Sequence, residues 1–354
     1  MPFRPLVSTI ALFSRGFLSR PWASSVEIKG MDRFLDILYD DRRRKDGRGI
    51  LTYANHISVM DDPTIFGKMP FSTFQRQETT RWTLGAADIM FTNALFRYFF
   101  THGQVLSTDR GRGVFQPSID TAIDKLLTGQ WVHIFPEGYV NMSRKAICRR
   151  FKWGIGRLLL ESHREKTPIV IPIWIEGLDA MMPEPRNHPR WMPRPGANIK
   201  ITFGDPVEST LGPLLPSKAP AWQTVSSPVS SNQAASNVSL SDSRSISRAS
   251  SSSISDDISS FSSSIDADYP APTSDKYPPP TPLAPPPPGG YALPQAGSRS
   301  HNSLASGADQ PEARLLRSRL AAALRARLLQ LGEKSAGKEL RGLVHTLMKE
   351  ERIE

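Results

Sequence analysis

A histidine and an aspartate five positions apart, His56 and Asp61, are the residues of this chain best suited to acid–base chemistry. An imidazole titrates near neutral pH, and a carboxylate bonded to one ring nitrogen fixes the tautomer and stabilises the imidazolium. Pro63 suits the first turn of a helix that Asp61 or Asp62 would cap, which leaves His56 in the preceding loop. Because an isolated pair of this kind is more often a surface histidine beside a helix cap, its interpretation as a catalytic pair requires support from other motifs.

Two further motifs carry residues that suit a phosphate-bearing ligand. Arg110, followed by Gly111, offers the rigid fork of guanidinium donors that fits an oxyanion. Pro136, Glu137 and Gly138 end a strongly apolar run, so the glutamate is expected at the edge of a sheet, where Gly138 would let a ligand approach the backbone. Each motif alone is weak evidence for ligand binding, and the order of the motifs along the chain strengthens that evidence.

The apolar run from Pro168 to Trp174 is predicted to be a buried strand, although it contains Pro172. Because proline cannot donate a backbone hydrogen bond, this strand is expected at an edge or at a bulge of the sheet. Such a position would leave room for an acyl chain.

The elements that must position these residues follow from the alternation of β-rich runs and helical patterns between about residue 49 and residue 203. This alternation predicts an α/β domain with a mixed, largely parallel sheet flanked by helices. Each motif falls at the end of a strand or in the loop after it, where open α/β sheets bind ligands. The predicted strands are Ile50–Ala54, Gln104–Ser107, Trp131–Phe135, Val170–Trp174 and Ile199–Phe203, and the predicted helices include Met31–Arg44, Pro117–Thr128 and Gly154–Arg164.

In this order, the four motifs resemble those of the glycerophospholipid acyltransferase superfamily: H-x-x-x-x-D, a Gly…Arg phosphate block, F-P-E-G and a proline-bearing apolar strand. The resemblance implies the fold of those enzymes, with His56 as the base that deprotonates an acceptor hydroxyl and Asp61 as its orienter. Asp62 is then left to cap the helix. The resemblance also implies that Arg110 and the Glu137 block bind the glycerophosphate, and it implies neither a cofactor nor a metal.

Longer stretches are similar to the tafazzin family, a branch of that superfamily, and the last helical segment is similar to its fungal members. This similarity implies cardiolipin remodelling without coenzyme A, with a phospholipid as acyl donor and monolysocardiolipin as the lysophospholipid acceptor. It also implies a mitochondrial protein, peripheral or interfacially anchored on the intermembrane-space-facing side of the inner or outer membrane. The similar stretches are Arg81–Ala87, Trp131–Gly138 with Val140–Ser143, Arg150–Arg157 and Leu316–Ala322.

The composition favours an anionic partner, because the chain of 354 residues has a net charge of +10. The sequence has neither zinc-finger spacing nor the aromatic signature of RNA-binding domains, so an anionic membrane surface that contains cardiolipin is expected rather than nucleic acid. Cys148 is the only cysteine, which excludes an intrachain disulfide and a cysteine-rich metal site. The oligomeric state stays open.

Changes in composition divide the chain into four segments. Residues 1–30 are predicted to be an Arg-rich amphipathic segment: a mitochondrial address, an interfacial anchor or a plain first helix. Residues 31–215 are the predicted acyltransferase domain, and the Ser- and Pro-rich residues 216–310 are predicted to be a disordered insert. Residues 311–354 are predicted to be a basic amphipathic helical segment that lies on a membrane or docks onto the core. Its apolar stripe consists of Leu316, Leu320, Leu324, Leu328 and Leu331.

A dense group of aromatic residues between Leu84 and Phe100 predicts contact with a membrane. The segment also contains Asp88 and Arg97 and is too short and too charged to span a bilayer, but such aromatics suit the boundary between headgroups and acyl chains. A helix whose aromatics complete the core is the alternative. The predicted contact residues are Phe91, Phe96, Phe99 and Phe100.

Taken together, the motifs predict an enzyme that transfers an acyl group between a phospholipid and a lysophospholipid. A lysophosphatidic acid acyltransferase that depends on acyl-coenzyme A would use the same four motifs and is the first alternative. A non-catalytic membrane-shaping protein is the second, although the presence of His56, Asp61, Arg110 and Glu137 argues against it.

Overall fold

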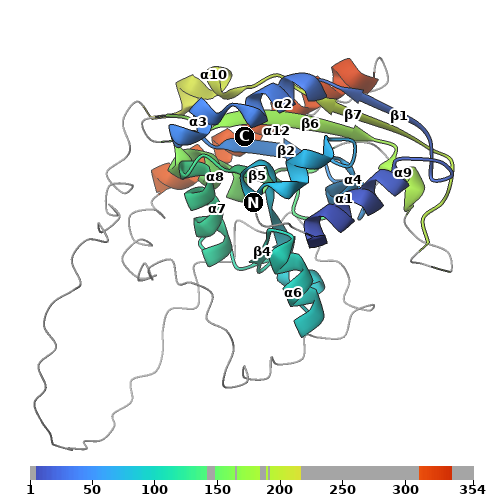
Figure 1. Cartoon of the computed structure of the whole chain (residues 1–354). Helices are drawn as coiled ribbons and strands as arrows, with labels where there is room; N and C mark the ends of the chain where they lie inside the picture. The colour runs from blue at the N-terminus through green and yellow to red at the C-terminus, as the bar shows by residue number, and fades with distance from the viewer. Residues whose placement is uncertain are drawn as a thin grey trace, which may run out of the picture. The chain divides into compact units, whose positions relative to one another are not determined.

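The computed structural model describes residues 5–141, 148–163, 166–183, 189, 192–216 and 311–336. Almost all of the predicted Ser- and Pro-rich insert, residues 217–310, lies outside the described residues, as do residues 337–354 of the C-terminal segment. The described part contains a seven-stranded sheet with helices on both faces (Figure 1). The predicted fold class, a mixed and largely parallel sheet flanked by helices, is therefore confirmed.

The strands of the sheet lie in the order β1-β7-β6-β2-β5-β3-β4. β6 and β7 are antiparallel, and all other neighbouring strands are parallel. The strands are β1 (Ala23–Lys29), β2 (Ile50–Ala54), β3 (Trp82–Ala86), β4 (Val105–Thr108), β5 (Trp131–Ile134), β6 (Ile169–Glu176) and β7 (Ala197–Phe203).

The helices of the described ranges differ widely in length, and the longest of them is also the last. The α-helices are α1 (Pro5–Phe17), α2 (Met31–Tyr39), α3 (Asp41–Lys45), α4 (Asp61–Thr64), α5 (Ala87–Met90), α6 (Ala94–His102), α7 (Pro117–Leu127), α8 (Gly154–Ser162), α9 (Leu178–Met181), α10 (Glu208–Leu211) and α12 (Pro311–Ala336). The described part of the chain also has the short 3-10 helices η1 (Phe71–Gln75), η2 (Gln77–Thr79) and η3 (Gly212–Leu214).

Alternating side chains of the central strands face two separate hydrophobic clusters, as expected for a sheet that is covered on both faces. On one face, Leu51 and Tyr53 of β2 belong to a cluster with residues of α7, α8 and α12. On the other face, Ile50 and Ala54 belong to a cluster with residues of α1, α2 and α9. β2 is therefore buried along its whole length, which fixes the position of the loop that follows it.

The predicted helix Met31–Arg44 is divided into α2 and α3 at Asp40. Asp40 has an extended backbone, and its side chain accepts hydrogen bonds from the backbone N–H groups of Arg42 and Arg43. An aspartate that caps a new helix ends the preceding one, so the prediction of a single helix is wrong here.

Pro172 does not place β6 at an edge or a bulge of the sheet, because β6 lies between β7 and β2. Pro172 pairs with Tyr53 of β2, and on the opposite side the pairing with β7 ends at Phe203. Beyond this point the N–H of Gly204 donates to the carbonyl of Pro172 at 2.8 Å. The proline therefore interrupts no strand pairing, because β7 has ended where its missing N–H would point.

The apolar stripe of α12 faces the core, which resolves the choice between membrane and core for this helix. Leu320, Leu324 and Leu328 are fully buried, and α12 packs against α8 and β6. α1 packs on the fold in a similar way, because Val7 and Ala11 are buried and Arg15 donates to the carbonyls of Gly67 and Met69. No helix in the described ranges is long and apolar enough to cross a membrane.

Candidate active site

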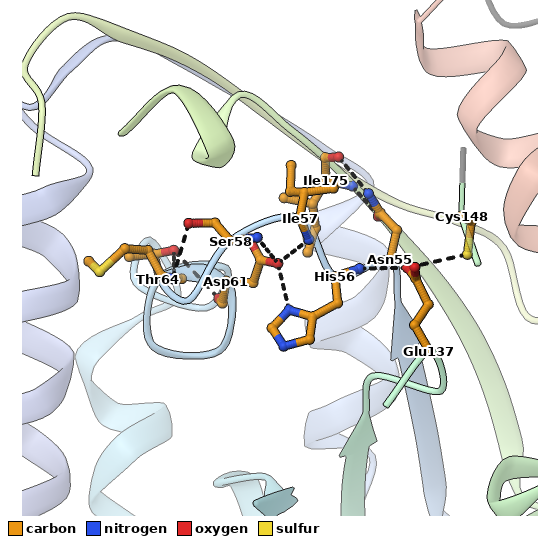
Figure 2. Close-up of polar contacts among 10 residues, drawn as sticks. Asn55, His56, Ile57, Ser58, Asp61, Thr64, Glu137, Cys148 and Ile175 are labelled. Atoms are coloured by element: carbon orange, nitrogen blue, oxygen red, sulfur yellow. Dashed lines mark hydrogen bonds and ion pairs between the residues drawn. The ribbon is translucent and has the colours of Figure 1, made fainter. Parts of the chain in front are cut away.

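His56 and Asp61 meet in the loop that leaves β2, as the sequence predicts. His56 Nδ1 lies 2.9 Å from Asp61 Oδ2, and the same oxygen accepts the backbone N–H groups of Ile57 at 2.7 Å and Ser58 at 2.9 Å (Figure 2). The His56 ring stacks on Phe135 with a centroid distance of 4.3 Å. Since Asp61 engages Nδ1, Nε2 is the ring nitrogen available for proton transfer.

The side chains of His56 and Asp61 differ in how deeply they are buried. The Asp61 side chain is fully buried, whereas the His56 side chain keeps 19% of its surface exposed. Burial raises the pKa of Asp61, while the hydrogen bonds from His56, Ser58 and Ile57 oppose that rise. The carboxylate is thus a fixed internal acceptor, and the imidazole reaches the surface.

Asp62 does not cap the helix, contrary to the prediction. α4 has Met60 at its N-cap without a side-chain cap, and the Asp62 carboxylate instead pairs with Arg81, with Nη2 to Oδ2 at 2.6 Å and Nε to Oδ1 at 3.1 Å. The Arg81 guanidinium lowers the pKa of Asp62, although burial works in the opposite direction. A third bond, from Arg81 Nη2 to the Asp62 carbonyl at 3.0 Å, ties the residue before β3 to α4.

Glu137 lies beside His56, but its carboxylate points into the protein. Oε1 accepts the backbone N–H of His56 at 2.8 Å and the thiol of Cys148 at 3.4 Å (Figure 2). Oε2 accepts the N–H of Arg149 at 2.9 Å. The residue is buried, and burial raises the pKa of Glu137 against the opposing effect of these donors. In this geometry Glu137 holds the backbone of the loop, and binding of substrate by its carboxylate would require these bonds to open.

Two more contacts fix the loop that carries His56. The Asn55 side chain replaces a strand partner, because its Nδ2 donates to the Ile175 carbonyl at 2.9 Å and its Oδ1 accepts the Ile175 N–H at 2.8 Å (Figure 2). On the other side, the N–H of Asn141 donates to the His56 carbonyl at 2.6 Å. The position of the imidazole therefore depends on β6 and on the segment after β5 as well as on Asp61.

Arg110 and Gly111 follow β4, at the same edge of the sheet as His56, because β2, β5, β3 and β4 run parallel. The Arg110 guanidinium pairs with Asp88, its Nε lying 3.1 Å from Oδ1, and it lies over the Tyr139 ring at 4.9 Å. Gly111 has a φ of +90°, which favours glycine at this turn. A phosphate that bound Arg110 would have to displace or share the carboxylate of Asp88.

The remaining predicted binding residues lie in the turn after β5. Pro136 is buried and its carbonyl accepts the N–H of Lys152 at 2.8 Å. Gly138 is exposed, has a φ of +75° and is the backbone position of this block that a ligand could reach. The structure thus divides the predicted binding block into a buried part, Pro136 and Glu137, and an exposed part, Gly138.

The predicted membrane-contact residues cluster on and beside α6, in which no residue is buried. Phe91, Phe99 and Phe100 are half-buried and Phe96 is exposed. The ring of Phe100 contacts the other three rings. These aromatics therefore do not complete the core, which was the alternative to membrane contact.

Sequence reasoning assigned no role in the site to Arg81, Cys148 and His133. His133 is fully buried next to the site, and burial lowers its pKa to about 3. Its Nδ1 lies 2.9 Å from the hydroxyl oxygen of Thr52. Arg81 and His133 lie within the stretches similar to the tafazzin family, whereas Cys148 lies outside them, and the sequence reveals the partners of none of the three.

Comparison with known proteins identifies the family of this chain. Residues 36–176 match the family model described as Acyltransferase. The chain is 33% identical over 210 residues to an Arabidopsis thaliana protein named N-acylphosphatidylethanolamine synthase, which covers 59% of this chain and 71% of that protein. The chain belongs to the acyltransferase family.

Within this family the chain is similar to tafazzins. It is 34% identical over 206 residues to tafazzin from Drosophila melanogaster, which covers 57% of this chain and 50% of the fly protein. It is 37% identical over 194 residues to taffazin from Dictyostelium discoideum, which covers 54% of this chain and 66% of that protein. The chain thus spans between half and two thirds of these two relatives.

Proposed function

We propose that this protein transfers an acyl group from a phospholipid to a lysophospholipid and so remodels cardiolipin, with monolysocardiolipin as acceptor and without coenzyme A. The observation that carries the proposal is the hydrogen bond of 2.9 Å between His56 Nδ1 and Asp61 Oδ2 at the carboxyl edge of the sheet. Similarity to the fly and Dictyostelium tafazzins supports the choice of lipids.

In the proposed reaction, His56 Nε2 takes the proton from the hydroxyl of the lysophospholipid, and the oxygen attacks the ester carbonyl of the donor. Collapse of the tetrahedral intermediate breaks the donor ester bond, and the departing lysophospholipid oxygen takes the proton back from His56. Asp61 stabilises the imidazolium between the two steps. Acyl groups and protons balance, so the reaction needs no cofactor.

Headgroup binding is assigned to Arg110, Gly111 and the exposed backbone at Gly138. Exchange of the Asp88 carboxylate for a lipid phosphate would keep the Arg110 guanidinium paired throughout. Glu137 and Pro136 contribute indirectly from their buried positions. Both shape the turn after β5, and Glu137 holds the His56 backbone. Correct placement of both lipids is itself a large part of the rate enhancement in such a reaction.

A membrane would deliver these lipids through α6. The exposed fractions of Leu95, Phe96 and Tyr98 are 72%, 44% and 61%. α5 and α6 follow the carboxyl end of β3, and Asp88 of α5 contacts Arg110, so this apolar surface is connected to the site. We assign it to the headgroup boundary of an anionic, cardiolipin-containing leaflet, and a mitochondrial, peripheral location fits that assignment.

A second acyl acceptor is suggested by the similarity to the Arabidopsis N-acylphosphatidylethanolamine synthase. In that reaction type the nucleophile is an amine rather than a hydroxyl, and the same base would take its proton. A third candidate, acylation of lysophosphatidic acid by acyl-coenzyme A, uses the same histidine with a different donor.

One experiment separates these candidates. Purified protein is incubated with vesicles of phosphatidylcholine, phosphatidylethanolamine, monolysocardiolipin and lysophosphatidic acid, with and without acyl-coenzyme A, and products are identified by lipid mass spectrometry. The proposal expects cardiolipin without coenzyme A, in an amount equal to that of the lysophosphatidylcholine and lysophosphatidylethanolamine released from the donors. N-acylphosphatidylethanolamine as the main product, or product only with acyl-coenzyme A, would contradict it.

A further inference from the structure

The longest helix, α12, lies far from His56 in the sequence but is bonded to the segment that supports it. The Arg325 guanidinium donates two hydrogen bonds to the Cys148 carbonyl, from Nε at 3.2 Å and from Nη2 at 2.8 Å. Arg325 and Cys148 are both buried. A buried guanidinium is costly unless it is well bonded, so this contact fixes the position of Cys148 relative to α12.

Cys148 and the residue after it connect this contact to Glu137 through hydrogen bonds. Its thiol donates to Glu137 Oε1 at 3.4 Å, and the next residue, Arg149, donates its N–H to Glu137 Oε2 at 2.9 Å. Burial raises the pKa of Cys148 well above its usual range, so the sulfur keeps the proton that it donates. Glu137 Oε1 in turn accepts the N–H of His56 (Figure 2).

A second contact joins α12 to the strand that leads into the site. The hydroxyl of Tyr53, a residue of β2, donates to the Leu324 carbonyl at 3.0 Å. Tyr53 is fully buried and lies three positions before His56. Two neighbouring residues of α12 therefore support the loop that carries His56. Leu324 contacts β2, the strand before the loop, and Arg325 acts through Cys148 on the Glu137 carboxylate, which bonds the His56 backbone.

α12 approaches the sheet and α8 so closely that glycines are required at the contacts. A Cβ atom on Gly156 of α8 would lie 2.2 Å from the Arg317 carbonyl oxygen. A Cβ atom on Gly332 of α12 would lie 2.7 Å from the Trp174 ring. These close contacts fix the position of α12 on either side of Leu324 and Arg325. The groups of these two residues that form hydrogen bonds are therefore held in place as well.

We infer that α12 is a positioning element of the active site, in which Arg325 acts through Cys148 and Glu137 to set the His56 backbone. Arg325, Cys148 and Tyr53 are positioning residues, because none of them touches the imidazole. This inference rests on the proposed function for its effect on rate, but its structural effect on His56 can be measured separately.

The test uses the full chain and two sets of variants. Arg325→Met removes the donors but keeps the length of the side chain, and Arg325→Lys keeps a charged donor. Arg319→Met is the matched control, because Arg319 is an exposed residue of the same helix. Cys148→Ala removes the thiol donor, whereas Cys148→Ser keeps a donor at nearly the same place.

Two readouts are taken on each variant: kcat and KM for transfer to monolysocardiolipin, and the pH titration of the His56 imidazole by NMR, assigned with His56→Gln. Arg325→Met and Cys148→Ala are expected to lower kcat by about tenfold or more with KM nearly unchanged, because a small displacement of a catalytic group has effects of this size. Both variants should also shift the His56 titration, and Arg325→Lys and Cys148→Ser should restore most of both readouts.

The outcomes separate the inference from the proposed function. If the wild type transfers no acyl group, the proposed function fails while the NMR titration still decides the inference. If Arg325→Met does not fold, the Cys148 pair decides it. A folded Arg325→Met or Cys148→Ala variant with the wild-type titration of His56 would overturn the inference, as would an equal shift in Arg319→Met.

Discussion

Asp61 Oδ2 bonds the imidazole of His56 and the backbone N–H groups of Ile57 and Ser58, so one atom holds both the His56 ring and the shape of its loop. On an ideal helix, a separation of five residues would place the two side chains roughly 140° apart. The tight turn between His56 and α4 removes this difficulty. Sequence reasoning identified the pair, but it could not give the backbone donors, because these depend on the turn itself.

At this residue, Asp61→Asn is expected to lower kcat by roughly 10³ to 10⁴ with little change in KM, because the neutral amide cannot stabilise the imidazolium. The transfer of labelled acyl chains measures the rate. Asp179→Asn is the control, since Asp179 is an exposed aspartate of α9. An Asp61→Asn variant with a rate close to that of the wild type would contradict the assigned role.

His133 predicts a pH dependence of stability. Burial lowers its pKa to about 3 from the usual 6.5, with Asp62 opposing this effect and Arg81 and His56 adding to it. Below about pH 6.5 the unfolded chain therefore binds a proton that the folded chain does not, so stability is lost as the pH falls from about 6.5 towards 3. For this one group the loss is at most about 1.4 kcal/mol for each pH unit.

The His133 prediction is checked by urea unfolding of the wild type and of His133→Gln between about pH 7 and about pH 5. The wild type should lose more stability over this interval than the variant does, even if the variant is less stable throughout. His102→Gln, at an exposed position, should behave like the wild type. Parallel curves for the wild type and His133→Gln would show that His133 is not the group responsible.

Among the elements, α6 presents an apolar surface that the described part of the chain does not cover. Its exposed side chains differ in part from those that the sequence pointed to: Leu95 and Tyr98 are more exposed than Phe96, while Phe99 and Phe100 pack into a ring cluster. Aromatic density alone could not separate these groups, because the separation depends on which face of the helix turns towards β4 and α1.

We expect simultaneous replacement of Leu95, Phe96 and Tyr98 by serine to weaken binding to phosphatidylcholine–cardiolipin vesicles by at least about tenfold, because each exposed apolar side chain contributes to insertion. Co-sedimentation measures binding, and the melting temperature should stay near that of the wild type. Leu315→Ser, at an exposed apolar position on α12, is the control. Unchanged sedimentation of the triple variant would exclude α6 as the membrane contact.

The close contact between α8 and α12 predicts the effect of a single methyl group added at Gly156. Gly156→Ala places a Cβ atom 2.2 Å from the Arg317 carbonyl oxygen, and such overpacking should reduce stability by about 1–3 kcal/mol despite the higher helix propensity of alanine. Gly212→Ala is the matched control, because no atom lies within 4 Å of its added Cβ atom. Urea unfolding compares the two, and a Gly156→Ala variant as stable as the control would contradict the close contact.

For the whole molecule, the sequence predicted the class of the sheet and most of its central strands, because β2, β5 and β6 are apolar runs between polar turns. It missed β1 and β3. In β1 the buried pattern is weak because most of its residues are half-buried or exposed, and β3 contains Gly85 between half-buried residues. The leucine stripe of the last helix also gave no indication that Arg317 and Arg325 are buried. Such long-range contacts leave no local signal in the sequence.

Proton transfer by His56 is the step on which the proposed acyl exchange between two lipids depends. The most direct measurement compares wild-type protein with His56→Gln on vesicles that contain labelled phosphatidylcholine and monolysocardiolipin, without coenzyme A. The wild type is expected to form labelled cardiolipin, and the variant should be slower by roughly 10³ or more while it still binds the vesicles. Labelled cardiolipin formed by His56→Gln at the wild-type rate would contradict the account.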